Sequence, residues 1–286
     1  MTGFINFARA HGVEINPSKF YAGEKVRRCG TVDKPKSSNG AYFWDGARGW
    51  VFNWAAEARV QWFNDGNAKP WTEQEKAQWR QRRDAAKASQ EHDHQRAAIR
   101  AQELIRNSKP LEHAYLHRKG FPDKQGLVAA DGALLIPMRD VFSNAVNGVQ
   151  SIRWNEPERK FEKKMNSGMK AKGAVFRMGD RLARETVLCE GFVTGLSIEA
   201  AMRNVGMKAA VLVCFSAHNL EHVARLIKGR VFVFADNDAS KTGEQSAINT
   251  GLPYCMSDEL GEDANDLHMR AGLFAVAQKL MEVRRK

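Results

Sequence analysis

Hydrophobic residues in roughly the last third of the chain form short runs that end on acidic residues. The runs 187–189 and 231–235 are followed by Glu190 and by Asp236-Asn237-Asp238. Apolar runs of this length, bounded by glycine and acids, are typical of buried strands in a parallel sheet. The carboxyl ends of such strands meet at one edge, where ligands and metals bind. The pattern therefore predicts a candidate active site at this edge.

Helical patterns separate the apolar runs. Residues 192–205 and 220–227 have helical character, and another apolar run, 209–215, lies between them. The order strand, helix, strand, helix, strand is that of a parallel α/β unit. A further acidic segment, 261–266, precedes a last helix that we expect over 273–283. Its Asp263 and Asp266 are candidates to complete a metal site.

Carboxylates at neighbouring strand ends repel one another, so their clustering is favourable when a cation neutralises them. Hard oxygen ligands select Mg²⁺ or Mn²⁺, which stabilise phosphoryl transfer. We expect Asp236, Asp238 and Asp263 to be ligands. Glu190 is either the general base or a further ligand, and the residues alone leave both roles open.

The acidic motifs together resemble a known domain. Glu190-Gly191, Asp236-x-Asp238 and the Gly-x-Asp-x-x-Asp segment at 261–266 are similar, in order and spacing, to the Toprim domain of DnaG-type primases, topoisomerases and some nucleases. Each piece alone is common, but the combination is specific. The alternative is that Glu190 merely favours a helix dipole and that Asp236 and Asp238 form a solvated turn.

The preceding segment, 132–179, predicts short strands separated by turns and crowded with cations. These cations are interleaved with aromatic residues: Arg153, Lys160, Lys163, Lys164, Lys170, Lys172 and Arg177 with Trp154, Phe161 and Phe176. Such a mixture suits a nucleic-acid or triphosphate surface, although a solvated hairpin face is the alternative.

Part of this basic segment resembles the N-terminal subdomain of the DnaG-type primase core. The similar stretches are Ser151-Ile152-Arg153, the run 163–168 and Lys172-Gly173, with Lys164 where the family has tyrosine. The resemblance implies that Arg153, Lys163 and Asn166 contact nucleotide phosphates or the template. Our nucleotide- and DNA-binding set is Arg153, Lys163, Lys164, Asn166, Lys170 and Lys172.

Residues 109–121 resemble the entry segment of phage and plasmid Toprim primases. His113 and His117 lie at the i, i+4 spacing of a zinc pair, but no cysteine or third histidine is near them. We therefore expect them to pack or to lie on a helix surface.

The first part of the chain is rich in aromatic residues. Six of the seven tryptophans lie there: Trp44, Trp50, Trp54, Trp62, Trp71 and Trp79. Residues 26–31, 39–46 and 49–54 predict three strands joined by glycine and asparagine turns. This β module resembles the zinc ribbon of phage primases without its ligands, because Cys29 is its only cysteine, so zinc is not expected. Arg27, Arg28, Lys34, Lys36 and exposed rings would suit single-stranded DNA, unless the rings are simply a core.

Residues 72–107 contain neither proline nor glycine and predict a long, exposed, charged helix. We therefore expect four parts: an aromatic module (1–70), a helical linker (71–108), a basic subdomain (109–180) and a Toprim catalytic domain (181–286). The predicted fold class is α+β, in which a C-terminal α/β domain with a parallel sheet follows a small basic α+β subdomain and the N-terminal β module.

Composition and charge agree with a nucleic-acid partner. The chain has 286 residues and a formal charge of +11, which favours a polyanion. No stretch reads as a membrane span or a signal peptide, and the four cysteines are unclustered. We therefore expect a cytoplasmic protein, in a bacterial host if it is phage- or plasmid-encoded.

The resemblance implies a DNA primase of the DnaG-type Toprim family, of the phage and plasmid kind. Such an enzyme makes short RNA primers on single-stranded DNA from ribonucleoside triphosphates. The alternatives are a Toprim nuclease, or an inactive primase-like accessory that binds DNA during replication. A topoisomerase is disfavoured because the four tyrosines have no recognisable domain context. The sequence has no phosphate-loop motif, so we expect any helicase to be a separate protein.

Overall fold

A computed structural model describes residues 2–54, 59–63, 72–180 and 182–285. The chain forms two compact units, residues 1–82 and residues 83–286. Each unit contains hydrophobic clusters of its own. None of the helices in the described ranges combines the length and the apolar character needed to span a lipid bilayer.

The first unit is built on an antiparallel sheet with the strand order β1-β2-β3-β4-β5. Its elements are α1 (Thr2–Ala10), β1 (Val13–Glu14), η1 (Pro17–Lys19), β2 (Gly23–Thr31), β3 (Gly40–Trp44), β4 (Gly49–Asn53) and β5 (Gln61–Phe63). The three expected strands correspond to β2, β3 and β4. The expectation of only three was wrong, because β1 and β5 are too short for an alternating pattern to identify them.

Aromatic side chains fill the core of the first unit. Phe4 from α1 stacks on Trp44 with a distance of 4.6 Å between ring centroids, and Tyr42 belongs to the same cluster. Trp54 and Trp62 are instead exposed. The tryptophans therefore divide between core and surface, and Trp71 lies outside the described residues.

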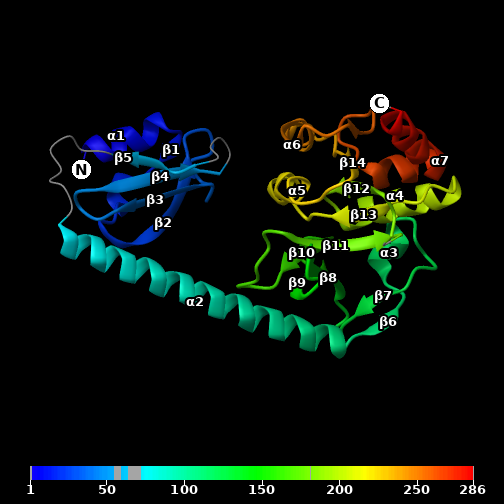
Figure 1. Ribbon diagram of the computed structural model, residues 1–286, viewed down its shortest axis with the longest axis horizontal. Helices are drawn as coiled ribbons and strands as arrows, with labels where there is room; N and C mark the ends of the chain where they lie inside the picture. The colour runs from blue at the N-terminus through cyan, green and yellow to red at the C-terminus, as the bar shows by residue number, and fades with distance from the viewer. Residues whose placement is uncertain (1, 55–58, 64–71, 181, 286) are drawn as a thin grey trace. The chain divides into compact units, whose positions relative to one another are not determined.

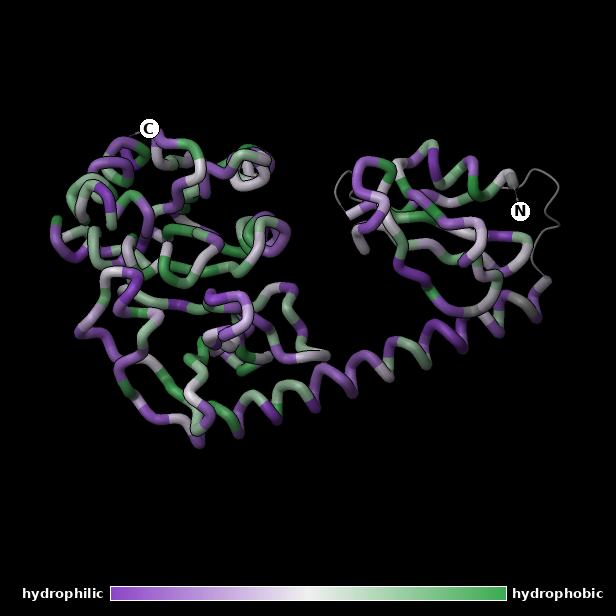
Figure 2. Tube along the Cα trace, turned by 180° about the vertical axis from the view of Figure 1, so that it is seen from behind, coloured by the Kyte–Doolittle hydropathy of each residue, from purple (hydrophilic) through white to green (hydrophobic). Residues whose placement is uncertain are grey.

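The helix expected over 72–107 is confirmed as α2 (Glu73–Arg106). Hydrophilic residues recur along its whole length (Figure 2). The boundary between the two units falls inside this helix. Its C-terminal part belongs to the second unit and packs within it, because Asn166 Nδ2 donates to Ala97 O at 3.0 Å and Arg100 donates to Ser167 O at 2.9 Å.

The second unit is built on one mixed sheet, with the order β10-β9-β8-β11-β13-β12-β14-β15 and with β6 and β7 paired beside β8. Its strands are β6 (Lys109–Leu111), β7 (Gly126–Val128), β8 (Leu134–Asp140), β9 (Val146–Asn155), β10 (Lys160–Met165), β11 (Ala174–Gly179), β12 (Glu185–Cys189), β13 (Ala210–Val213), β14 (Arg230–Phe234) and β15 (Tyr254–Cys255). Its helices after α2 are α3 (Ala114–Arg118), α4 (Phe192–Asn204), α5 (Ala217–Ala224), α6 (Thr242–Thr250) and α7 (Ala264–Arg284).

The expected parallel α/β unit is confirmed. Strands β13, β12, β14 and β15 pair in parallel, and β11 pairs antiparallel to β13 and so joins them to the antiparallel strands. Figure 1 shows α4 and α7 on one side of the parallel strands and α5 and α6 on the other. Alternate side chains of the strands feed two hydrophobic clusters, one under each helix pair. This alternation is what a buried parallel sheet requires.

Two helices differ from their expected bounds. We predicted the last helix over 273–283, but α7 begins at Ala264 and is interrupted at Gly272, where φ is 83°. The glycine made the first segment look like a loop in the sequence. The helix expected over 220–227 is α5, which begins earlier because Ser216 caps it by accepting a hydrogen bond from Asn219 N.

Candidate active site at the ends of strands β12 and β14

The predicted acids follow two adjacent strands. Strands β12 and β14 pair in parallel, with Leu188 opposite Val233. Glu190 comes directly after β12, and Asp236 and Asp238 come just after β14. Because adjacent parallel strands end at the same edge, the fold brings these three carboxylates to one place, as the sequence pattern predicted.

Asp236 has the most strongly perturbed carboxyl group of this edge. Burial, together with the negative charges of Asp263, Glu190 and Asp238, raises the pKa of Asp236 to about 8, and the charge of Lys163 opposes the rise. Its Oδ1 atom is buried and has no hydrogen-bond partner in the described part of the chain. A buried oxygen of this kind is costly unless a proton or a cation satisfies it.

Glu190 shares the same environment. Burial raises the pKa of its carboxyl group, the charge of Asp238 adds to the rise, and a hydrogen bond from the backbone of Ala217 opposes it. The backbone carbonyl of Glu190 accepts a hydrogen bond of 2.9 Å from Phe215 N. This backbone hydrogen bond joins the residue that follows β12 to the loop that follows β13, beside the Glu190 carboxylate.

Asp238 is held by the loop that leads into α6. Its carboxylate accepts hydrogen bonds from Ser240 Oγ, from Thr242 N at 3.3 Å and from Gly243 N at 3.0 Å. These bonds, with that from Ser240 the largest cause, lower the pKa of Asp238. Asp238 therefore stays ionised beside two groups whose pKa values are raised.

Asp263 and Asp266 begin α7. Asp263 is the N-cap, and Asp266 accepts a hydrogen bond from the Asp263 backbone, which completes a capping box. Asp263 Oδ2 also accepts a 2.8 Å bond from Thr194 Oγ1. Asp266 faces Lys119, whose Nζ is 3.5 Å from Oδ1. The negative charge of Asp263 raises the pKa of Asp236, whereas the carboxylate of Asp266 accepts the hydrogen bond of the cap and pairs with Lys119.

The donor atoms at this edge suit a hard cation. Carboxylate oxygens are the ligands that Mg²⁺ and Mn²⁺ prefer, and the unpartnered oxygen of Asp236 offers one of them. Within the described ranges, no three histidine, cysteine, aspartate or glutamate side chains already converge as a metal-binding group. The residues fit a divalent cation by their chemistry and charge rather than by a preformed coordination shell.

The basic residues divide between the two faces of the β9–β10 hairpin. In an antiparallel pair, opposite residues share a face and successive residues alternate. Lys163 lies opposite Ile152 on one face, and Lys164 lies opposite Ser151 on the other. Lys164 forms an ion pair with Glu162, and Arg153 forms one with Asp131. The positive charge of Lys163 acts on Asp236 and opposes the rise of its pKa.

The other predicted binding residues lie elsewhere in the second unit. Asn166 Oδ1 accepts from Val149 N at 2.8 Å while its Nδ2 donates to α2, so both ends of the amide are used in packing. The charge of Lys170 acts on Asp140, and that of Lys172 acts on His222. The structure therefore does not gather the six residues around one point.

Several residues near the site were missed in the sequence. Thr194 lies in an apolar helix and shows no signal of its own. Tyr115 is buried, and its hydroxyl has no partner among the described residues. His113 caps α3, since its Nδ1 accepts from Tyr115 N at 3.1 Å and its Nε2 lies 3.1 Å from Gly132 O. Unlike Thr194 and Tyr115, His113 was named in the sequence, where we expected it to pack or to lie on a helix surface; it is a half-buried helix cap.

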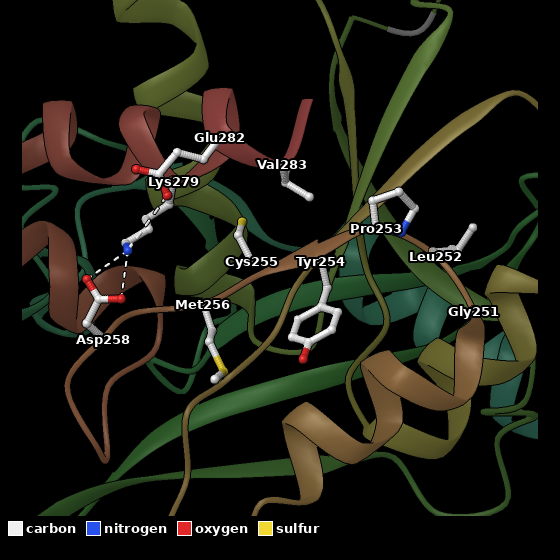
Figure 3. A pocket seen from close by; sticks show the side chains of 10 residues that line it. All are labelled: Gly251, Leu252, Pro253, Tyr254, Cys255, Met256, Asp258, Lys279, Glu282 and Val283. Carbon is white, nitrogen blue, oxygen red and sulfur yellow. Dashed lines mark hydrogen bonds and ion pairs between the residues drawn. The ribbon is translucent and has the colours of Figure 1, made fainter. Parts of the chain in front are cut away.

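A separate hollow of about 600 Å³ lies between β15 and α7 (Figure 3). Residues 251–256 line one side, and Lys279, which bonds both oxygens of Asp258 at 2.7 Å, lines another. None of the predicted acids lines it. The hollow is therefore no part of the candidate site.

Comparisons with known proteins give a match to a family model and a match to a solved structure. Residues 185–273 match the family model of a Toprim domain. No curated protein matches the chain. Among solved structures, the chain is similar to one titled as the structure of the DnaG catalytic core, with 14% identity and a TM-score of 0.37. That match covers 52% of this chain and 52% of the other, and so spans about half the length of the solved chain.

Proposed function

We propose that the protein is a DNA primase, of the kind carried by phages and plasmids, which synthesises short RNA primers on single-stranded DNA. The Toprim match at residues 185–273 supports metal-dependent phosphoryl transfer in general. One observation favours primer synthesis in particular: the charge of Lys163, from the hairpin that precedes the domain, reaches Asp236. A cation whose charge acts on an acid cluster is what a site for a nucleoside triphosphate needs.

In this proposal the acids and the lysine have different tasks. Asp236 and Asp238, with Asp263 beside them, would hold the divalent cation. Bound Mg²⁺ or Mn²⁺ would supply the positive charge that balances the developing charge on the phosphate oxygens. The Lys163 ammonium would bind the triphosphate and orient it. Glu190 would accept the proton of the attacking 3′-hydroxyl, because a raised pKa makes a carboxylate a better base.

The test is primer synthesis by the purified chain. Single-stranded DNA, labelled ATP and the other nucleoside triphosphates would be incubated with Mg²⁺ or Mn²⁺, and the products separated on a denaturing gel. We expect short labelled oligomers from the wild type and none from Asp236→Asn or Glu190→Gln. Asp84→Asn is the matched control, since Asp84 is exposed on α2 and pairs only with its neighbour Arg83 in the described residues.

Other outcomes of this assay would distinguish the alternative functions, a Toprim nuclease and an inactive accessory protein. Metal-dependent shortening of the DNA without oligomers would assign a Toprim nuclease. Retention of DNA binding with neither product would assign an inactive accessory protein. Oligomers that persist in Asp236→Asn would show that synthesis occurs elsewhere in the chain.

A further inference from the structure

One face of the β9–β10 hairpin combines an exposed ring with Lys163, a cation that has no acidic partner among the described residues. Trp154 lies opposite Phe161, two residues along from the Ile152–Lys163 pair, so Trp154, Phe161 and Lys163 share this face. The other face carries the pairs Arg153–Asp131 and Lys164–Glu162, whose charges are neutralised within the protein. The two faces therefore differ in the charge that they offer to a ligand.

The indole of Trp154 is held in place although 38% of the residue is exposed. Its Nε1 donates to Glu156, and its ring meets Phe161 edge-on at a centroid distance of 5.1 Å. The guanidinium of Arg118 from α3 lies 4.5 Å from the centroid of the indole. A large exposed apolar ring with restricted motion is a ready surface for stacking, because little conformational entropy remains to be lost.

Arg118 and Lys163 are available to bind phosphate. Neither has a carboxylate within ion-pair distance in the portions that the structure describes, and both are exposed. Arg118 lies beside Trp154, whereas the positive charge of Lys163 acts on the pKa of Asp236. Arg118 is therefore the cation beside the exposed ring, whereas Lys163 lies nearer to the acids.

The hairpin is also joined to the acidic edge by a shared core. Ile152 and Tyr115 pack in one cluster with Phe192 and Val193, the first residues of α4 after Glu190. The hairpin is therefore packed, through this buried cluster, against the helix that follows Glu190.

We propose that Arg118 and Trp154 form a stacking shelf, on which a base of single-stranded nucleic acid stacks while Arg118 binds a neighbouring phosphate of the strand. This inference rests on the proposed function, because it assigns the surface along which the template approaches. Stacking on aromatic rings beside cations is how proteins bind single strands with little sequence preference. The shelf would accordingly bind strands of different sequence.

The test measures binding of the full-length chain to a fluorescent single strand by anisotropy, without nucleoside triphosphates. A second strand of the same length carries abasic sugars, which keep the phosphates and remove the bases. We expect Trp154→Leu to weaken binding of the normal strand about tenfold and to leave binding of the abasic strand unchanged. Trp154→Phe should retain most of the affinity. Phe142→Leu is the matched control, since Phe142 is a 70% exposed ring in the same unit.

Two results would overturn the shelf. Unchanged binding by Trp154→Leu would remove Trp154 from the interface. Equal weakening on the normal and the abasic strands would show that the ring acts through the fold rather than by stacking. A wild type that shows the base-dependent difference but makes no primers would reject the proposed function and keep the shelf. Primer synthesis with unchanged strand binding by the variant would reject the shelf alone.

Discussion

The hydroxyl of Thr194 donates a hydrogen bond of 2.8 Å to Oδ2 of Asp263 and thereby joins the first turn of α4 to the cap of α7. Thr194 is fully buried. Asp263 already accepts bonds from Asn265 N at 2.6 Å and Asp266 N at 2.9 Å, so the threonine fixes its second oxygen. The orientation of one acid beside Asp236 therefore depends on a residue of a different helix.

Thr194→Val should destabilise the protein by about 1.5–3 kcal/mol, because a partly buried carboxylate oxygen of Asp263 loses its donor while the shape of the side chain is kept. Chemical denaturation would measure the change in the free energy of unfolding. Thr194→Ser, which retains the hydroxyl, is the control and should lose less. If the valine variant proved as stable as the serine variant, the bond would contribute nothing measurable.

The backbone of Asp236 is in close contact with α6. A Cβ atom added to Gly243 would lie 2.4 Å from Asp236 O and 3.1 Å from Asp236 N. Gly243→Ala should therefore displace the helix or the strand end and cost about 1–3 kcal/mol of stability. The same change should reduce any activity of the acidic edge, since Gly243 N also donates to Asp238.

Thermal unfolding and the primer assay would check this expectation together. Gln245→Ala is the control, because this residue lies on the exposed side of the same helix. Wild-type stability in Gly243→Ala would mean that the helix adjusts without cost.

Cys29 in β2 should react slowly with alkylating reagents. Burial raises the pKa of its thiol from 9.0 to about 11, against the smaller opposing effect of the Arg28 charge. Because the thiolate is the reactive form, alkylation at pH 8 should be about a hundredfold slower in the folded than in the denatured chain. The rate should rise about tenfold per pH unit up to pH 10.

Peptide mass spectrometry after timed iodoacetamide treatment would give the rate for Cys29 separately from the other cysteines. Because the pKa of Cys29 is raised in the folded state, its neutral thiol contributes to the free energy of unfolding. This contribution is fully present below pH 9 and is lost as the pH rises through about 11. A folded-state rate equal to the denatured rate would show that the thiol is not shielded.

The sequence predicted the parallel strands and the acids at their ends because both depend on local pattern. Apolar runs bounded by acids can be recognised without knowing which strands pair with them. The tasks of Asp263 and Asp266 were harder to predict, since Gly272 made the first segment of α7 look like a loop. A capping-box pattern at 263–266 was present in the sequence and could have signalled the helix start.

Contacts between distant segments could not be predicted from the sequence. The bond between Thr194 and Asp263 and the contact of Arg118 with Trp154 depend on how separate elements pack. The alternation of Lys163 and Lys164 was predictable from the strand period, but which face meets the acids depends on the register with β9 and on the position of α3.

That alternation gives a direct test on two neighbouring lysines. Lys163→Gln should lower kcat/KM for nucleoside triphosphates by about 10- to 100-fold, because a charge-assisted bond to phosphate contributes about 1.5–3 kcal/mol. Lys164→Gln should change it less than about threefold, since its ammonium is paired with Glu162 on the opposite face and an exposed ion pair contributes little. Steady-state primer synthesis at varied nucleotide concentration would measure both.

The comparison separates a specific contact from general electrostatic attraction, because both variants remove one charge from adjacent positions. Equal losses in the two variants would indicate that only the net charge of the hairpin matters. A larger loss in Lys164→Gln would mean that the outer face meets the nucleotide and that the charge of Lys163 on Asp236 has no part in binding. A selective loss in Lys163→Gln is the expected result, because the register of β9 with β10 puts Lys163 and Lys164 on opposite faces and the proposal assigns the nucleotide to Lys163.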